Sequence, residues 1–211
     1  MNRSIICFIG TDGAGKSTII SELKQKLEQK YGSEVRAIYF GWKPFLPTTK
    51  LLSFILRKRN YQIADKMNSE NNKKEEKFSL FQEIMLSYYY AEYLFRYLFQ
   101  LRMPSLLQRR ITLVDRYFYD MYAHYQYAGK SVIFPILLKI MPKPDLTIFL
   151  DTSVQIAKQR KPEMDLQLLQ RHYQRYQELS KLIGARAVKT DQKLEQSVHE
   201  VLTLLEERLQ D

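Results

Sequence analysis

The segment at residues 10–18 constrains the fold of this chain more than any other part of the sequence. It reads GTDGAGKST and fits the pattern G-x-x-x-x-G-K-[S/T]. An apolar, β-prone run at residues 5–9 precedes it, and an amphipathic helical pattern follows it directly. A strand, a glycine-rich turn and a helix in this order are the context in which the pattern forms a phosphate-binding loop. The sequence therefore predicts an α/β fold that begins with a nucleoside triphosphate site.

The residue types of the loop suit this chemistry. Its glycines let successive backbone N–H groups converge on an anion at the N-terminus of a helix. Lys16 adds a positive charge for the β- and γ-phosphates, and Ser17 offers a hydroxyl to Mg²⁺. A tight turn with a lysine beside it is the alternative, but it explains neither the complete pattern nor both flanks. The expected nucleotide-binding residues are Gly10, Asp12, Gly13, Ala14, Gly15, Lys16, Ser17 and Thr18.

The composition is that expected of one soluble domain. The chain has 211 residues, one cysteine and a formal net charge of +10. One cysteine cannot form a disulfide within the chain, which suits a reducing cytoplasm. The N-terminus lacks the apolar length of a signal peptide, and Glu92 and Arg96 interrupt the apolar stretch at 84–101, so no membrane span is expected. The positive charge indicates an anionic ligand, and no DNA or RNA motif accompanies it, so nucleic acid is not the expected partner.

Beyond the loop, apolar strand patterns alternate with helical patterns, which predicts a single α/β domain over residues 1–211. We expect strands at 35–40, 111–114, 146–150 and 185–189, and helices at 16–30, 48–59, 78–103, 132–141, 165–183 and 194–209. Gly32 and Pro104 are expected to end the helices before them. Residues 151–153 offer caps for a further helix that runs to Arg160. Residues 60–77 are polar, with little to bury, and predict a mobile excursion.

Further candidate residues follow the predicted strands, where open α/β sheets bind their ligands. Asp115 is placed to hold Mg²⁺ or its waters, and Arg116 can grip a phosphate with its planar fork. A helix-capping aspartate and a surface arginine are the alternative, which the position after a strand makes less attractive. Trp42 follows the second strand and could equally contact an acceptor substrate or belong to the core.

Two segments suggest motion or assembly. The basic turn at residues 160–163 could deliver positive charge to transferring phosphates as a lid, which we place at residues 158–165. A solvated connection between two helices explains the turn equally well. The helix expected at 78–103 has aromatic residues on more than one face, which is typical of helices that contact a second subunit.

Taken together, these segments resemble the thymidylate kinase family. The segments that carry the resemblance are FIGTDGAGKST at 8–18, LVDRY at 113–117, PDLTIFLD at 144–151 and RKPE at 160–163. The resemblance implies a P-loop NTPase-type three-layer fold, with a five-stranded parallel sheet flanked by helices. It further implies ATP and Mg²⁺ as cofactors, phosphoryl transfer to a nucleoside monophosphate, and a homodimer.

The resemblance also assigns roles by position. Lys16, Asp115, Arg116 and Arg160 correspond to catalytic residues, while Ser17 and Asp115 correspond to the metal site. Asp12 corresponds to the loop aspartate that faces the sugar of the acceptor. Since Ala14 gives the loop no basic side chain of its own, the lid arginine Arg160 gains importance.

The acceptor side departs from the family pattern. Ile9 stands where family members often carry Glu, and the usual proline-glycine loop after the second strand is missing. Tyr93 occupies the place of a helix arginine, so Arg96 could serve only with a shift in register. Asp120 replaces a serine, and a Tyr-Gln pair comes one position late. The expected acceptor-binding residues are Asp12, Trp42, Arg96, Arg116, Tyr117, Asp120 and Gln126.

These departures leave other functions open. One alternative is a kinase of the same fold that acts on a nucleoside, a sugar or a lipid-linked intermediate. Another is a nucleotide-binding protein without transfer activity. Asp120 would repel an anionic acceptor unless it faces a sugar hydroxyl or pairs with a base such as Arg116. On the sequence alone, we therefore predict that thymidylate is a poor substrate.

Overall fold

A parallel sheet organises the structure, a computed structural model that describes residues 4–32, 35–41, 80–107, 111–124 and 131–210. Within these ranges the sheet has five strands in the order β2-β3-β1-β4-β5, and every pairing is parallel. The strands are β1 (Ser4–Ile9), β2 (Arg36–Tyr39), β3 (Ile111–Asp115), β4 (Leu146–Asp151) and β5 (Arg186–Lys189). The expected five-stranded parallel sheet is confirmed.

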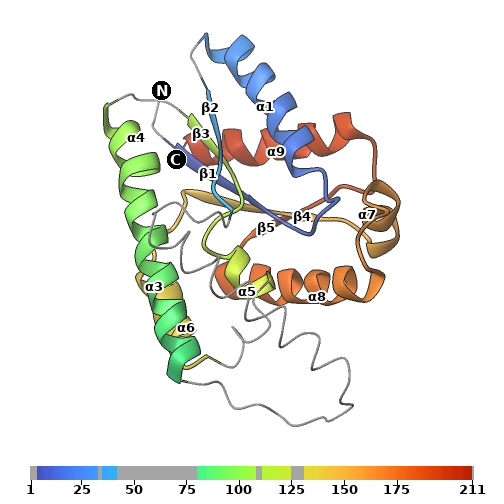
Figure 1. Cartoon of the computed structure of the whole chain (residues 1–211). Coiled ribbons are helices and arrows are strands. Elements are labelled where there is room, and N and C mark those ends of the chain that lie inside the picture. Colours follow the sequence, from blue (N-terminus) through green and yellow to red (C-terminus); the bar gives the residue numbers. More distant parts are fainter. Residues whose placement is uncertain (1–3, 33–34, 42–79, 108–110, 125–130, 211) are drawn as a thin grey trace.

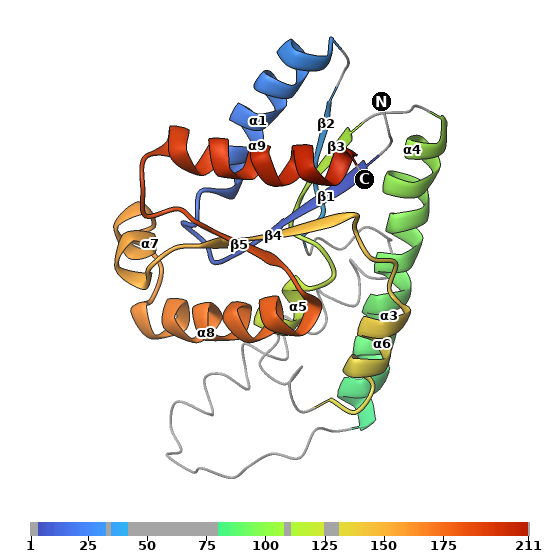
Figure 2. The same cartoon turned by 180° about the vertical axis from the view of Figure 1, so that it is seen from behind.

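Helices cover both faces of this sheet, which gives three layers (Figures 1 and 2). α1 and α9 lie on one face, while α3, α5, α6 and α8 contribute to the core on the other. Their bounds are α1 (Lys16–Tyr31), α3 (Leu80–Arg96), α4 (Met103–Leu107), α5 (Asp120–His124), α6 (Phe134–Ile140), α7 (Val154–Arg160), α8 (Leu166–Ile183) and α9 (Leu194–Gln210). Apart from α5, which we did not predict, and the α3–α4 region, these boundaries lie within two residues of the predictions.

The central strand β1 shows how the sequence builds the two cores. Successive side chains of a strand point to opposite faces of the sheet. Ile5, Cys7 and Ile9 belong to the core under α3, α5, α6 and α8. Ile6 and Phe8 belong to the core under α1 and α9. Because both faces are covered, the strand is a continuous apolar run, which is typical of buried parallel strands.

The prediction of one helix that Pro104 ends is wrong. α3 passes into a π-helical turn, η1 (Tyr97–Arg102), and α4 then continues through Pro104. Proline lacks a backbone N–H and cannot donate to the carbonyl of Gln100 four residues earlier. The Nη1 of Arg36, from β2, donates to that carbonyl at 3.0 Å. Pro104 lies in the first turn of α4, where its fixed φ suits the helix, so the chain stays helical.

The N-terminal caps of α7 and α8 also differ from the predicted capping at residues 151–153. Ser153 is the N-cap residue of α7, but no side chain of the predicted 151–153 cap bonds to the helix. The Ser153 backbone N–H instead donates to the Asp191 carboxylate at 3.0 and 3.1 Å. Asp165 caps α8, since its Oδ1 accepts from a backbone N–H three residues later at 2.8 Å. This cap ends the turn between α7 and α8, where we placed the lid.

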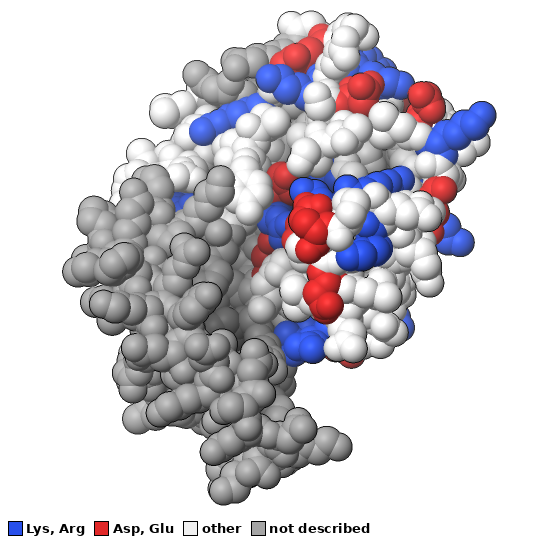
Figure 3. All heavy atoms as spheres, turned by 45° about the vertical axis from the view of Figure 1, so that its right-hand side comes forward, with Lys and Arg blue, Asp and Glu red and all other residues white. Residues whose placement is uncertain are grey.

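Several predictions fall on residues that are not described. The helix at 48–59, the excursion at 60–77, Trp42 and Gln126 all lie outside the described ranges. In the described part of the chain, no helix is long and apolar enough to cross a membrane. On the described part of the face in Figure 3, Lys and Arg side chains are interspersed with Asp and Glu. The positive net charge is therefore not gathered into one continuous area there.

Candidate active site

The loop between β1 and α1 packs tightly against two other elements, which explains its glycines. A Cβ atom at Gly10 would lie 2.8 Å from the backbone oxygen of Leu150 in β4. At Gly13, where φ is 85°, a Cβ atom would lie 2.6 Å from the backbone oxygen of Ala157 in α7. Both distances are shorter than any side chain tolerates, so only glycine fits. The loop is thereby fixed at the carboxyl end of β1, before the first turn of α1.

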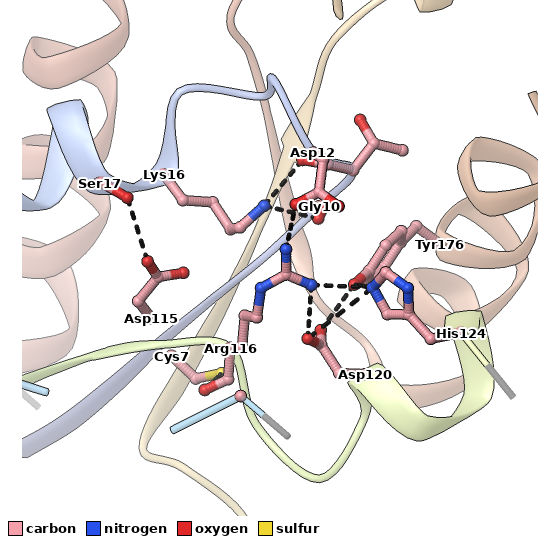
Figure 4. A network of polar contacts seen from close by, with 12 residues as sticks. Cys7, Gly10, Asp12, Lys16, Ser17, Asp115, Arg116, Asp120, His124 and Tyr176 are labelled. Atoms are coloured by element: carbon pink, nitrogen blue, oxygen red, sulfur yellow. Dashed lines mark hydrogen bonds and ion pairs between the residues drawn. The ribbon is translucent and has the colours of Figure 1, made fainter. Parts of the chain in front are cut away.

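Lys16 holds its ammonium group over this loop (Figure 4). Its Nζ donates to the backbone oxygens of Gly10 at 2.8 Å and Thr11 at 2.7 Å. The residue is only 7% exposed, so its stem belongs to the interior. Burial and nearby Arg116 together lower the Lys16 pKa to about 8, although three carboxylates oppose them. Near pH 7 the group is therefore still mostly charged, as a phosphate ligand requires.

Ser17 and Asp115 place oxygen atoms side by side next to the loop. The Ser17 hydroxyl donates to Asp115 Oδ2 at 3.3 Å. Asp115 Oδ1 is buried and has no hydrogen-bond partner. Burial raises the pKa of Asp115, although Lys16, Arg116 and the Ser17 hydroxyl counteract it. A carboxylate oxygen left without a partner beside a hydroxyl fits Mg²⁺, which prefers oxygen ligands.

Mg²⁺ needs few protein ligands in such a site. The ion commonly binds one or two carboxylates and completes its shell with phosphate oxygens and waters. Among the described residues there is no group of three or more His, Cys, Asp or Glu side chains that could hold a metal ion. A nucleotide-dependent Mg²⁺ site at Ser17 and Asp115 agrees with both observations.

Arg116 lies at the centre of the polar network in Figure 4. It follows β3 with a φ of 69°, which is unusual for a residue other than glycine, and its backbone N–H donates to Phe8 of β1 at 2.9 Å. Its Nη1 donates to Asp120 Oδ2 at 2.7 Å and to His124 Nε2 at 2.8 Å, and its Nη2 donates to Asp12 Oδ1. The structure therefore brings together the predicted residues Asp12, Arg116 and Asp120.

These contacts affect the charges of the two aspartates. Burial alone would raise the pKa of Asp12, but Arg116 and Lys16 outweigh it, so the pKa is lowered and Asp12 stays ionised. Asp120 is 2% exposed, and its charge is compensated by Arg116. Of the two situations expected for Asp120, the structure shows the pairing with a base. The carboxylate is not left to repel an anionic acceptor.

Two residues of this network, His124 and Tyr176, were not predicted from the sequence. The Tyr176 hydroxyl, from α8, donates to Asp120 Oδ1 at 2.6 Å. His124 stands four residues after Asp120 on α5, and this spacing places both on one helix face. That spacing was a usable signal for His124. No local pattern connects Tyr176 with Asp120, which lies 56 residues earlier in the chain.

Arg96 reaches the same region from α3. Its Nη1 donates to the backbone oxygen of Gly41 at 3.2 Å, and its guanidinium carbon lies 4.6 Å from the centre of the Phe40 ring. The residue is 5% exposed, and its Nε is buried without a hydrogen-bond partner. A Cβ atom at Gly41 would lie 2.6 Å from Cδ of Arg116. The two arginines thus flank Gly41 at the carboxyl end of β2.

Tyr117 and Arg160 lie outside this network of contacts. Tyr117 was expected to bind substrate, but it is fully buried and its hydroxyl donates to the Pro142 carbonyl at 2.5 Å. It belongs to the core because its ring stacks on Phe40. Arg160, the last residue of α7, donates to the backbone oxygens of Gly13 at 3.2 Å and Thr190 at 2.9 Å. It therefore contacts the phosphate-binding loop from the side of α7 and β5.

Comparison with known proteins decides the family. A family model described as thymidylate kinase matches residues 51–201, which is more than half of the chain. The chain belongs to the thymidylate kinase family. It is an ATP-dependent kinase that transfers a phosphoryl group to a nucleoside monophosphate. The phosphate-binding loop precedes the matched range, so its assignment depends on the motif and on the geometry described above.

Individual relatives agree with this membership. The chain is 28% identical over 165 residues to a thymidylate kinase of Mycoplasmopsis agalactiae, and the match covers 74% of this chain and 67% of that protein. The fold is similar to the crystal structure of thymidylate kinase from Ehrlichia chaffeensis, with a TM-score of 0.63 and 18% sequence identity. That similarity covers 97% of this chain and 100% of the other. It supports the P-loop kinase fold over the length of the chain.

Proposed function

We propose that this thymidylate kinase family member transfers the γ-phosphoryl group of ATP, with Mg²⁺, to a nucleoside monophosphate of which thymidylate is the first candidate. The observation that carries the proposal is the convergence of Lys16, Asp115 and Arg116 beside the phosphate-binding loop. The curated relative from Mycoplasmopsis agalactiae is itself named a thymidylate kinase. One of the reasons for expecting poor turnover of thymidylate, repulsion of the acceptor by Asp120, is removed because Asp120 is paired with Arg116.

On the donor side, the loop N–H groups and the Lys16 ammonium bind the phosphates of ATP. Ser17 and Asp115 hold Mg²⁺, which supplies positive charge to the phosphates when it is bound. Positioning and electrostatic stabilisation do most of the work in phosphoryl transfer, and they demand little covalent chemistry from the protein. Each of these side chains is already held by hydrogen bonds at the loop, which agrees with this need for preorganisation.

On the acceptor side, Arg96 and Arg116 are the proposed partners of the acceptor phosphate. Both flank Gly41, and Arg96 keeps a buried, unpartnered Nε. A buried donor without a partner costs about 1–3 kcal/mol, a cost that a bound anion would remove. The hydroxyls of Tyr90 and Tyr93 are also buried without partners on the same helix, and Tyr90, Tyr93 and Arg96 follow one another every three residues. This stripe supports a polar ligand along the inner face of α3.

The acceptor site can be tested separately from the donor site. Arg96→Met should raise KM for the nucleoside monophosphate at least about tenfold, because one anion partner is lost, while KM for ATP stays within about twofold. Arg102→Met, a partly exposed arginine of the neighbouring η1 turn, is the matched control and should change neither constant. Equal effects of the two substitutions, or a rise in KM for ATP alone, would contradict the acceptor role of Arg96.

Arg160 is proposed to act from the donor side, as a lid arginine that closes over ATP. Its support is the contact with the backbone oxygen of Gly13 within the loop. A role in stabilising the transferring phosphoryl group would need the guanidinium to move toward Lys16 and Arg116, as lids do on substrate binding.

A homodimer is the proposed assembly, and the cytoplasm the proposed compartment. The helical segment from α3 to α4 exposes a set of large apolar side chains, namely Phe95, Leu98, Phe99, Met103, Leu106 and Leu107. Exposed apolar patches of this kind commonly mark contacts between proteins. A second copy of the chain is the proposed partner of this surface. The free Cys7 thiol, buried in the core, suits a reducing compartment.

A further inference from the structure

Asp120 connects Arg116, which follows β3, with the helix α8. Its Oδ2 accepts from Arg116 Nη1 at 2.7 Å, and its Oδ1 accepts from the Tyr176 hydroxyl at 2.6 Å. Tyr176 is fully buried on α8, and Asp120 is buried on α5. Figure 4 shows the chain of contacts from the phosphate-binding loop through Arg116 to Tyr176. Three buried polar side chains therefore join the end of β3 to α8.

A buried carboxylate of this kind requires its partners. An ionised side chain in the interior is costly unless it is paired and its remaining oxygen lone pairs are satisfied. Asp120 meets both conditions, because its Oδ2 accepts from the charged Arg116 guanidinium and its Oδ1 accepts from the neutral Tyr176 hydroxyl. The Asp120 carboxylate is therefore held between Arg116 and Tyr176.

The pair also determines which part of Arg116 is left for a ligand. A guanidinium has five N–H groups in a fixed plane. Both N–H groups of Nη1 are used, by Asp120 and His124, and one of Nη2 is used by Asp12. The Nε–H and the second N–H of Nη2 have no partner among the described residues. Nε and Nη2 are neighbouring nitrogens, and the edge between them has the two-donor shape from which a phosphate accepts hydrogen bonds.

We propose that Asp120 and Tyr176 are a positioning pair that fixes the Arg116 guanidinium, so that its free Nε–Nη2 edge meets the transferring phosphoryl group. The pair makes α8, the helix that follows the turn after Arg160, responsible for the orientation of this arginine. Tyr176 acts through Asp120 and does not itself touch the phosphates. The proposal rests on the proposed phosphoryl transfer.

The first test is a kinetic cycle. Tyr176→Phe should lower kcat about tenfold, because a displaced catalytic group loses rate steeply, and should leave KM for ATP within about twofold. Tyr173→Phe is the matched control, since Tyr173 also lies on α8 but donates to Asp151 at 2.9 Å. It should leave kcat unchanged. In an Arg116→Lys background, Tyr176→Phe should cost almost nothing more, because the pair acts only through the guanidinium.

A purely structural role predicts a different pattern. Tyr176→Phe would then lower the melting temperature with the same relative effect on kcat in both backgrounds. That additive result would overturn the proposal, as would an unchanged kcat in the single variant. Absence of turnover by the wild-type protein with every nucleoside monophosphate would instead overturn the proposed function, and it is seen before any variant is made.

The second test does not depend on turnover. Side-chain ¹⁵N NMR separates the two Nη signals of an arginine when rotation about its Nε–Cζ bond is hindered. The Arg116 signals, assigned by their loss in Arg116→Lys, should be separate in the wild type and in Tyr173→Phe. They should merge in Tyr176→Phe and Asp120→Asn, because the Nη1 contacts are weakened. Identical signals in the wild type and Tyr176→Phe would show that the pair does not fix the guanidinium.

Discussion

At the residue scale, Asp115 must be ionised to bind Mg²⁺, although its burial favours the neutral carboxyl group. Burial raises its pKa, while Lys16, Arg116 and Ser17 favour the charged carboxylate. Its Oδ1 has no protein partner, so this oxygen can bind a cation. These features are common where a carboxylate serves a ligand rather than the fold.

The first prediction follows from this environment. Asp115→Asn should lower kcat by at least about tenfold and change the Kd for ATP much less, because the carboxylate acts chiefly as charge develops in the transition state. Titration with Mg²⁺ should show a raised requirement for the ion. Asp165→Asn is a suitable control, since asparagine also caps helices. Equal losses in ATP binding and turnover would indicate a structural residue.

How much of the site was predictable from the sequence depended on distance along the chain. The loop residues and Asp115 belong to short motifs next to strands, so local patterns were enough to predict their positions at the ends of β1 and β3. Their roles stay predictions. The pairing of Asp120 with Tyr176 needs α5 and α8 to pack together, and no local pattern encodes it. Tyr117 looked like a site residue because it follows Asp115 and Arg116, but its side chain turns into the core.

At the element scale, the lid turn gives the second prediction. Arg160→Ala should cost roughly 2–4 kcal/mol in kcat/KM, the range for groups that stabilise developing charge. If Arg160 stays at Gly13, the loss should fall mainly on KM for ATP; if the lid carries it to the phosphates, the loss should fall on kcat. Arg160→Lys should recover only part, since lysine lacks the planar fork. Unchanged rates in both variants would leave the turn as a solvated connection.

The packing of α5 against α8 gives the third prediction, which concerns pH. The rings of His124 and His172 lie 4.4 Å apart. Burial lowers the pKa of His172, and the neighbouring His124, Arg175 and Arg116 act in the same direction, so that the pKa is about 4 although Asp12 opposes them. The unfolded chain therefore binds more protons than the folded chain between about pH 6.5 and pH 4. The free energy of unfolding should fall as the pH is lowered through this window.

This dependence can be measured by denaturant unfolding at several pH values. His172 should account for about 1–2 kcal/mol of the loss between pH 7 and pH 4.5. His172→Leu should remove that part, whereas His199→Leu, at an exposed position of α9, should not. A wild type and a His172→Leu variant with the same pH dependence would contradict the assignment of a neutral, buried His172.

The π-helical turn shows why the element boundaries between α3 and α4 escaped prediction. Pro104 is a strong stop signal in a sequence, and most other boundaries followed their signals within two residues. Here the donor that replaces the missing proline N–H comes from Arg36, far away in the chain. A contact of that kind exists only after the fold has formed.

At the scale of the whole molecule, the exposed apolar side chains of the α3–α4 segment give the fourth prediction. Phe99→Glu should shift the protein from dimer to monomer in sedimentation or light scattering, since a charge at a buried contact is costly. Leu182→Glu, an exposed apolar position on α8, should leave the dimer intact. A monomeric wild type, or a dimer that survives Phe99→Glu, would show that this surface is not the contact between subunits.

The single domain over residues 1–211 also stays a prediction.

Phosphoryl transfer to a nucleoside monophosphate is tested most directly by the rate of ADP formation with ATP, Mg²⁺ and a panel headed by thymidylate. Lys16→Met is the reference variant, because methionine keeps the buried stem of Lys16 and removes the ammonium group. We expect a kcat/KM of about 10⁴ M⁻¹s⁻¹ or more for at least one acceptor, and loss of this activity in Lys16→Met at an unchanged melting temperature. Two results would contradict phosphoryl transfer to a nucleoside monophosphate at this site: a rate of ADP formation that no nucleoside monophosphate increases, or full activity in Lys16→Met.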